Sequence, residues 1–263
     1  MNTPILFFRN DDVGSTLDKS LVKMTNIFIK HEIPIVHAVE PANLTTDVIN
    51  WLIETKNNSN NLVEIIQHGF NHNKDNKYYQ MEFGGKRNYK DQFSDIQKGC
   101  KLMNLYFDHN WEKIFTFPYG RFNDFTIKAI NDMGYKGISS VISFNKKNLF
   151  KNYLGRRFKK NLLFNKVISY HLGKRPASNI WEVSISINII RKFVNKSEAI
   201  HNSYYNIINS FNTVKKKTSV IGILLHHHFH NDHLKLIEDL IIAFKSNHYK
   251  FSKISAIIDE ISK

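Results

Sequence analysis

The chain has 263 residues, of which 42% are hydrophobic and 23% charged, and this balance excludes an intrinsically disordered protein. The length suits one α/β domain with a full core, or two smaller domains. No apolar run reaches the roughly 18 residues that a membrane span needs, and the N-terminal residues lack a basic leader. The single cysteine, Cys100, cannot form an internal disulfide, so we expect a cytoplasmic location.

The net charge is strongly positive, with 37 Lys and Arg against 23 Asp and Glu, or +14. Only seven of the basic residues are Arg, the side chain best suited to bidentate contacts with phosphates and bases. Lys is spread along the whole chain. This composition disfavours nucleic acid as a partner and is compatible with an acidic glycan or lipid surface.

In the first half of the chain, short apolar runs alternate with helical patterns. We expect strands at 5–9, 34–39 and 62–67 and helices at 17–31, 46–56 and 89–107. Ser15 or Thr16 is the expected cap of the first helix. The long helix 89–107 is expected to bury one stripe of apolar side chains. These are Phe93, Ile96, Leu102 and Leu105.

The alternation continues in the second half. We expect strands at 113–117, 136–143, 181–187 and 220–226, and helices at 125–133, 197–211, 234–245 and 255–261. The segment 145–175, rich in Lys and Asn, has no regular pattern. No repeat or linker divides the chain, so the predicted fold is α/β, a single domain over residues 1–263 built as a distorted (β/α)7-type barrel.

Polar clusters follow four of the predicted strands. They are Asp11-Asp12, His68 with His72, Pro118-Tyr119, and His226-His227-His228. In parallel β/α folds the chemistry collects at the carboxyl ends of the strands. This recurrence is the first indication of a functional site.

The histidine pair has the spacing of metal ligands. His68 and His72 are four residues apart, and on one helical turn both rings would face one metal ion. With 13 histidines in the chain such a pair also arises by chance. Two surface or capping histidines are therefore the alternative interpretation.

Adjacent carboxylates on a strand point to opposite sides, so Asp11 and Asp12 are expected to differ in purpose. One can bind a metal while the other accepts a proton from water; the alternative is an N-cap cluster for the following helix. One Asp and two His leave an open position, as catalytic zinc sites require. Asp11 and His226 then remain as base and acid.

The histidine tract after the last strand is expected to place only one or two rings in a site. On a strand, His226, His228 and His230 share one face while His227 points away. The other rings are expected to be solvated or to begin the next helix.

These motifs resemble those of the polysaccharide deacetylases of the NodB-homology type (carbohydrate esterase family four). The matching segments are 8–14 (FRNDDVG), 68–72 (HGFNH), 115–120 (FTFPYG) and 223–226 (ILLH), and they come in the family's order over nearly the whole chain. Glu82-Phe83 with Arg87 also resembles a loop of a cytosolic branch linked with surface-glycan assembly.

The resemblance implies a role for each matched residue. Asp11 is the implied catalytic base and His226 the acid, with His227 as the alternative one register away. The implied metal ligands are Asp12, His68 and His72, and the implied metal is a divalent cation, Zn²⁺ above all. The implied substrate contacts are Pro118, the backbone N–H of Tyr119, Leu224 and, as a groove aromatic, Trp181, for which a place in the core is the alternative.

One departure concerns the third motif, where the family usually has an Arg that positions the catalytic Asp and this chain has Thr116. Either Arg9, Arg87 or Arg121 substitutes, or activity is reduced. The family's fourth motif is not clearly present.

The implied function is metal-dependent removal of an N-acetyl group from a sugar or glycan precursor, including anionic or lipid-linked forms. The alternatives are hydrolysis of a non-sugar amide or cyclic imide at the same site, and a catalytically degenerate glycan-binding protein.

Overall fold

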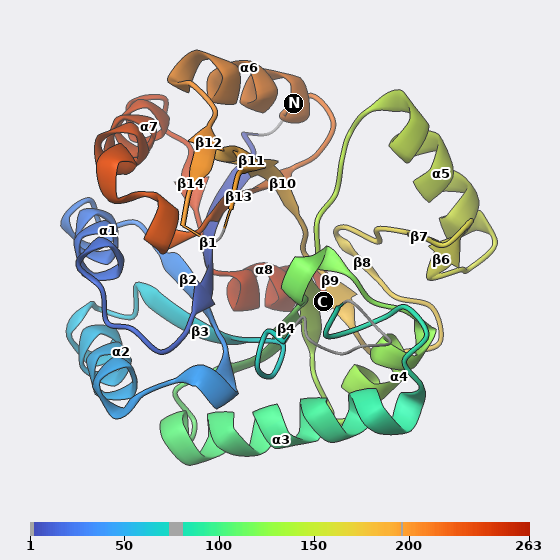
Figure 1. The fold of residues 1–263 in the computed structure, drawn as a ribbon. Coiled ribbons are helices and arrows are strands. Elements are labelled where there is room, and N and C mark those ends of the chain that lie inside the picture. Colours follow the sequence, from blue (N-terminus) through green and yellow to red (C-terminus); the bar gives the residue numbers. More distant parts are fainter. Residues whose placement is uncertain (1–2, 74–80, 196) are drawn as a thin grey trace.

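The structure is a computed structural model that describes residues 3–73, 81–195 and 197–263. Strands and helices alternate along the chain (Figure 1). The described helices are α1 (Lys19–Lys30), α2 (Thr46–Asn58), α3 (Tyr89–Phe107), α4 (Asp124–Asp132), α5 (Lys146–Arg157), α6 (Tyr204–Val214), α7 (Leu234–Ser246) and α8 (Ile254–Ile261). Short 3-10 turns are η1 (Pro41–Asn43), η2 (Pro118–Gly120), η3 (His227–Phe229) and η4 (Asn231–His233).

Seven strands run parallel to one another in the order β10-β13-β1-β2-β3-β4-β5. They are β1 (Ile5–Val13), β2 (Ile35–Val39), β3 (Val63–His68), β4 (Glu112–Thr116), β5 (Gly137–Ser139), β10 (Ile185–Asn188) and β13 (Val220–Leu225). The two ends of this series meet where the backbone N–H of Ile142 donates to the carbonyl of Ile185 (2.8 Å) and that of Ile185 to the carbonyl of Ser140 (2.8 Å). The predicted seven-stranded (β/α) barrel is therefore confirmed.

The remaining strands are short. β9 (Trp181–Glu182) pairs with β5, β8 (Gly173–Lys174) with β9, and β14 (Lys250–Phe251) with β1. Two hairpins stand apart from the barrel sheet, β6 (Leu162–Leu163) with β7 (Lys166–Val167), and β11 (Ile190–Phe193) with β12 (Ala199–His201).

The two faces of the barrel wall pack against different partners, as β1 illustrates. Leu6 and Phe8 belong to the large core between the wall and the surrounding helices, while Phe7 between them belongs to a smaller inner core. Side chains alternate across a strand, so this pattern follows from the period of two.

The inner core is completed by α8, which lies across the barrel in Figure 1. Glu64, near the start of β3, accepts the backbone N–H groups of Ile254 and Ser255 in the first turn of α8 (3.0 and 3.1 Å). A side chain at Gly137, where β5 begins, would collide with Ile258 of this helix. Because α8 closes the end where the strands begin, only the carboxyl ends are left open for a site.

Several predicted elements were wrong in detail. The expected strand 181–187 is two strands, β9 and β10, and the expected helix 197–211 begins only at Tyr204, after β12. The segment 145–175, for which no element was predicted, holds α5, β6, β7 and β8. Helix propensity is a weak guide where pairing with a distant strand decides the conformation.

Two side-chain predictions were also wrong. The cap of α1 is Asp18, which accepts the backbone N–H of Leu21 at 2.7 Å, not Ser15 or Thr16. On α3, Ile96 is buried as predicted, but Leu105 is 76% exposed. The buried side of α3 includes Gly99, Cys100 and Met103 instead.

Candidate metal centre and catalytic cleft

A cleft of about 1200 Å³ opens at the carboxyl ends of the barrel strands. It collects most of the site residues predicted from the sequence, although they are up to 215 positions apart. Those that line it are Asp11, Asp12, His68, His72, Tyr119, Leu224 and His226.

Three metal-ligand side chains converge in this cleft. Asp12 Oδ1 lies 3.0 Å from His68 Nε2 and 3.3 Å from His72 Nε2, and the three ligand atoms lie within 4.8 Å of one another. They form the one such group of His, Cys, Asp and Glu among the described residues. One carboxylate and two imidazoles match the donor set of catalytic zinc sites, so the residues present fit a divalent metal.

The backbone is distorted where these side chains are presented. The β1–β2 register shifts between Asn10 and Val13, the position of the two aspartates, as bulges beside active sites often do. Asp12, His72 and Tyr119 all have left-handed φ angles, of 61°, 54° and 59°. Such conformations are costly outside glycine and cluster at functional sites.

The histidine pair does not lie on a helical turn, which corrects the reason given for its spacing. His68 is the last residue of β3, and the chain turns at Gly69, where φ is +62°. A Cβ at Gly69 would stand 2.5 Å from Pro118 Cγ and 2.7 Å from Glu82 Oε2. Only glycine fits, because both the conformation and the space exclude a side chain.

Glu82 holds this turn in place. Its carboxylate accepts the backbone N–H groups of Phe70, Asn71 (3.1 Å) and His72 (2.9 Å). The side chain is buried, which raises the pKa of Glu82, although the same N–H groups and the nearby histidines oppose the increase. Sequence analysis assigned Glu82 only to a loop that resembles one in the family, and it missed this contact. A hydrogen bond to backbone N–H groups does not depend on the residue types of the donors, so it leaves no pattern in the sequence.

Tyr119 fixes the second histidine. Its ring lies 4.4 Å from the ring of His72, and its hydroxyl donates to the His72 carbonyl (2.9 Å) while lying 2.8 Å from His72 Nδ1. A hydroxyl that donates to the carbonyl can accept from Nδ1–H, and this contact orients the ring so that Nε2 faces Asp12. Such outer contacts set the tautomer of metal-ligating histidines.

Arg9 of β1 pairs with Asp11. Arg9 donates from Nε and a terminal nitrogen to the two carboxylate oxygens of Asp11, both at 2.7 Å, and from its other terminal nitrogen to the backbone and hydroxyl oxygens of Ser139. Both charged side chains are buried. Of the three predicted substitutes, Arg9 is the one beside Asp11, since Arg87 pairs with Asp95 and Arg121 is exposed.

The structure also separates the two candidate acids. His226 lines the cleft with its Nε2 3.8 Å from Asp12 Oδ2. His227 faces the other way, toward Asn10 and Asp18, and its Nε2 lies 3.4 Å from Asp18 Oδ2. The strand ends at Leu225 and the chain enters η3, so the predicted shared strand face of His226, His228 and His230 was wrong.

Only two of the four predicted substrate contacts line the cleft. Leu224 and Tyr119 line the cleft, and Pro118 packs behind it against Gly69. Trp181 does not line it. Its strand β9 pairs at Gly137, where β5 begins, and its side chain packs on the inner core at the opposite end of the barrel. Phe193 of β11 is an aromatic residue of the cleft wall that was not predicted, with its ring 5.2 Å from that of His226.

Charge interactions set the protonation of the site. Burial opposes ionisation of Asp12, but hydrogen bonds from His68 and His72 and the charge of His226 outweigh it and hold the pKa of Asp12 well below its usual value. Burial opposes the charging of His68 as well, yet Asp11 and Asp12 raise its pKa. For His226 burial wins over the two carboxylates, and its pKa is lowered.

No family model matches the chain, and no curated protein is similar to it in sequence. Solved structures, however, share the fold. A protein from Mycobacterium smegmatis assigned as a polysaccharide deacetylase superposes with a TM-score of 0.65 at 10% identity, covering 99% of this chain and 91% of that one. A family 4 acetyl xylan esterase from Clostridium thermocellum, bound to a cobalt ion, gives 0.59 at 11% identity, with 97% and 90% covered.

A family-four pseudoenzyme from Bacillus anthracis is also similar, with a TM-score of 0.59 at 12% identity over 98% of this chain and 66% of that one. The chain therefore has the fold of the carbohydrate esterase family four deacetylases. At this identity the likeness concerns the fold. Among the residues that the structure describes, no helix combines the length and the apolar character needed to cross a bilayer.

Proposed function

We propose that residues 1–263 form a metal-dependent deacetylase that hydrolyses an N-acetyl group on a sugar or glycan precursor. One observation carries the proposal: the Asp12, His68 and His72 group lies in the same cleft as Asp11 and His226. The cleft has a volume of about 1200 Å³, and the chain has the fold that known family-four deacetylases use.

Asp12, His68 and His72 would hold the cation, with Zn²⁺ as the proposed metal. When bound, such a cation acts as a Lewis acid toward the acetamide carbonyl and lowers the pKa of water toward about 7. Tyr119 keeps the imidazole of His72 in place, and Glu82 holds the backbone of the turn that carries it.

Asp11 serves as the general base and takes the proton of the attacking water. Its bidentate pair with Arg9 fixes the position of the carboxylate. His226 protonates the leaving amine, so the products are acetate and a free amino sugar. Positioned acids and bases of this kind contribute roughly 10²–10⁴-fold each. Leu224 provides an apolar wall for the acetyl methyl group, and the backbone N–H of Tyr119 is the proposed oxyanion donor.

The Arg9–Asp11 pair weighs against a degenerate binding protein, since the missing third-motif Arg was the main support for that alternative. The B. anthracis pseudoenzyme has the same fold, and a mutant of it has restored enzymatic activity.

The test measures metal content and acetate release together. Zinc is titrated into the metal-free protein, and acetate is assayed with chitooligosaccharides, simple acetamides and a cyclic imide. We expect Asp12→Ala to lose zinc binding and turnover together, and Asp11→Asn to keep zinc while kcat falls roughly 10²–10⁴-fold. Asp18→Asn is the matched control, because Asn caps a helix as well as Asp does and Asp18 lies outside the cleft.

Normal turnover by Asp11→Asn would overturn the assignment of the base. Turnover of acetamides or the imide alone would move the substrate class to non-sugar amides. Zinc binding without turnover of any compound would leave a glycan-binding protein. A cytoplasmic site of action is part of the proposal, supported by Cys100 being buried and unpaired, and cell fractionation checks it.

A further inference from the structure

The segment after β5 presents an exposed surface that the proposed reaction does not use. It consists of α5 and the β6–β7 hairpin, at the right-hand edge of the molecule in Figure 1. We call it the α5 face. Its exposed aromatic side chains are Phe150 (65%), Tyr153 (65%), Phe158 (64%) and Phe164 (85%).

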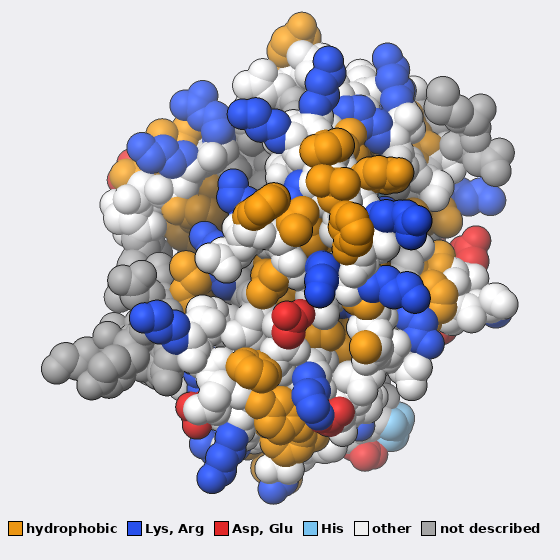
Figure 2. All heavy atoms as spheres, turned by 90° about the vertical axis from the view of Figure 1, so that its right-hand side faces the viewer, with side chains coloured by type: hydrophobic (Ala, Val, Ile, Leu, Met, Phe, Trp, Pro, Cys, Tyr) orange, Lys and Arg blue, Asp and Glu red, His pale blue; other side chains and the backbone are white. Residues whose placement is uncertain are grey.

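The same segment is exclusively basic. Residues 145–166 contain eight Lys and Arg and no Asp or Glu, and no acidic residue occurs anywhere in 133–181. The basic residues are Lys146, Lys147, Lys151, Arg156, Arg157, Lys159, Lys160 and Lys166. Figure 2, which looks at this side of the molecule, shows hydrophobic side chains gathered in the upper half and Lys and Arg side chains around them.

This exposure is not the result of a loosely attached segment. Only Asn152 and Gly155 of α5 are buried, so most of the helix surface is free. The attachment itself is specific, because Asn152 Oδ1 accepts the backbone N–H of Ser169 and Arg156 Nε donates to its carbonyl (2.8 Å). Gly155 lets Ile168 approach so closely that a Cβ would stand 2.4 Å from it.

The hairpin tip carries the most exposed aromatic. Phe164 and Asn165 connect β6 to β7 with φ angles of 50° and 56°, the left-handed pair of a tight hairpin turn. A bulky residue is unfavourable in that conformation, and its ring has no protein surface to cover. An aromatic ring so exposed at a hairpin tip is free to insert into a surface outside the protein.

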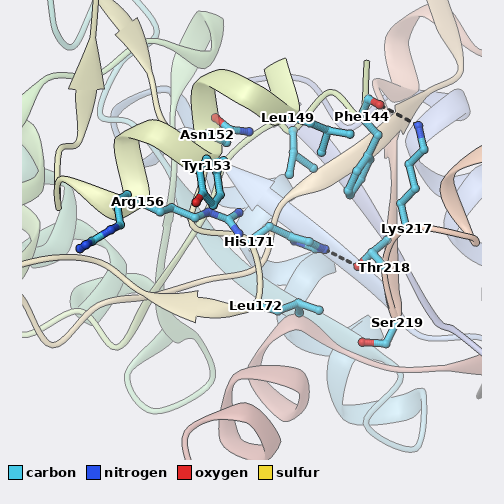
Figure 3. Close-up of a pocket in the computed structure, with 12 residues that line it drawn as sticks. Phe144, Leu149, Asn152, Tyr153, Arg156, His171, Leu172, Lys217, Thr218 and Ser219 are labelled. Carbon is cyan, nitrogen blue, oxygen red and sulfur yellow. Dashed lines mark hydrogen bonds between the residues drawn. The ribbon is translucent and has the colours of Figure 1, made fainter. Parts of the chain in front are cut away.

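A pocket of about 680 Å³ lies beside α5 (Figure 3). Its lining combines apolar groups such as Ile142, Phe144 and Leu149 with the basic side chains of Arg156, Arg157 and Lys217. Figure 3 shows Leu149, Tyr153 and Arg156 of α5 on one side and Lys217 to Ser219 on the other. The pocket therefore repeats the chemistry of the α5 face.

The lining of the pocket beside α5 and the lining of the candidate catalytic cleft meet along the chain. Val141 lines the cleft, and the next residue, Ile142, lines the pocket.

We propose that the α5 face docks on an anionic lipid bilayer, with its Lys and Arg near lipid phosphates and its aromatic rings at the headgroup level. Basic side chains interleaved with aromatic ones are the composition of membrane-interface segments, and polybasic segments bind anionic leaflets. A second copy of the chain is disfavoured, because the face would meet eight like charges. Single-stranded nucleic acid stacks successive bases on aromatic side chains along a basic groove, whereas Phe164, the most exposed ring of this face, stands alone at a hairpin tip.

The experiment measures partitioning onto vesicles of 100 nm by co-sedimentation. One set is pure phosphatidylcholine and the other contains 30% phosphatidylglycerol. We expect the protein to partition at least tenfold more strongly onto the anionic vesicles, and this preference to disappear between 50 and 500 mM salt as the charges are screened. The salt and lipid comparisons need no variant.

Variants then locate the surface. Phe150→Ser with Phe164→Ser is expected to weaken partitioning about tenfold or more, since two membrane-inserted rings are lost. Leu105→Ser is the matched control: Leu105 is 76% exposed on α3, away from the α5 face, and its loss should change nothing. Thermal unfolding midpoints equal to that of the parent protein establish that both variants fold.

Equal partitioning onto neutral and anionic vesicles, or none onto either, would overturn the proposal. So would an equal loss in Leu105→Ser. Binding of a 30-nucleotide single strand by a protein that ignores vesicles would assign the face to nucleic acid, and a concentration-dependent dimer that Phe164→Ser abolishes would assign it to a second copy.

Discussion

Arg9 and Asp11 are two residues apart on β1, on the same side of a strand that bends at a bulge. From the sequence, Arg9 was one of three possible partners for Asp11, because Arg87 and Arg121 carry the same charge. Only the closed barrel decides among them, since it brings the Ser139 oxygens of β5, a strand that does not pair with β1, to the place where the Arg9 guanidinium needs its remaining acceptors.

We expect Arg9→Lys to lower kcat/KM on the order of 100-fold while zinc affinity changes less than threefold. A single ammonium cannot hold both oxygens of a carboxylate, and small misplacements of a catalytic group cost about 100-fold. Steady-state kinetics and zinc titration on the same sample measure the two effects. Arg121→Lys is the control, because Arg121 is exposed, and an equal loss in that variant would refute the assignment to Arg9.

The positions of the candidate metal ligands depend on where strands and turns end. Asp12 lies near the carboxyl end of β1 and His68 at that of β3, and only β2 separates these parallel strands. The strand pattern of the sequence was therefore enough to predict that the two side chains meet. The turn from Gly69 to His72 is different, because its shape comes from Glu82, whose position no periodicity predicts.

Glu82→Gln should weaken zinc binding about 10–100-fold, the usual cost of losing an outer contact of a metal ligand. In the parent protein these backbone N–H groups donate to the Glu82 carboxylate. In the variant, the amide NH₂ group would face one of them, and because two donors cannot form a hydrogen bond, the turn must shift. Zinc titration by calorimetry measures the change.

Glu64→Gln is the matched control, because Glu64 lies near the start of β3, the strand that ends at His68. Glu64 is also buried and also accepts backbone N–H groups, but those of α8. We expect that variant to lose stability and keep its zinc affinity. If both variants bind zinc like the parent protein, Glu82 does not organise the site.

The barrel as a whole encloses several histidines in uncharged form. Burial lowers the pKa of His37 to about 3 and, with a smaller opposing effect of Glu182, that of His171 to about 4. His37 sits between Asn10 and Thr25 under the site, and His171 contacts Thr218 beside the α5 pocket. Each ring must gain a proton in the unfolded chain at mild acidity.

The free energy of unfolding should therefore fall as pH drops below about 6.5, the value for an exposed histidine. The unfolded chain binds more protons in this range, so stability rises with pH and is lost on acidification. Between pH 7.5 and 5.5 the two rings together account for about 3 kcal/mol. Urea unfolding at both pH values measures it, and a stability that does not change would contradict the burial of neutral imidazoles.

The sequence by itself determined the elements whose signal is local. The helix 89–107 was predicted to the residue, and the parallel barrel followed from alternating strands and helices. The convergence of the candidate metal ligands followed from residue types at or near strand ends. Spacing along one element carries this information, because side chains on a strand or helix have a fixed period.

Only the tertiary structure decided what depends on contacts between distant segments. It paired Arg9 with Asp11, chose His226 over His227 for the cleft, and moved Trp181 to the opposite end of the barrel. It also folded 145–175 into a helix and a hairpin whose aromatic rings face outward. In each case packing and strand register outweigh local preference, and neither is encoded in any short stretch of sequence.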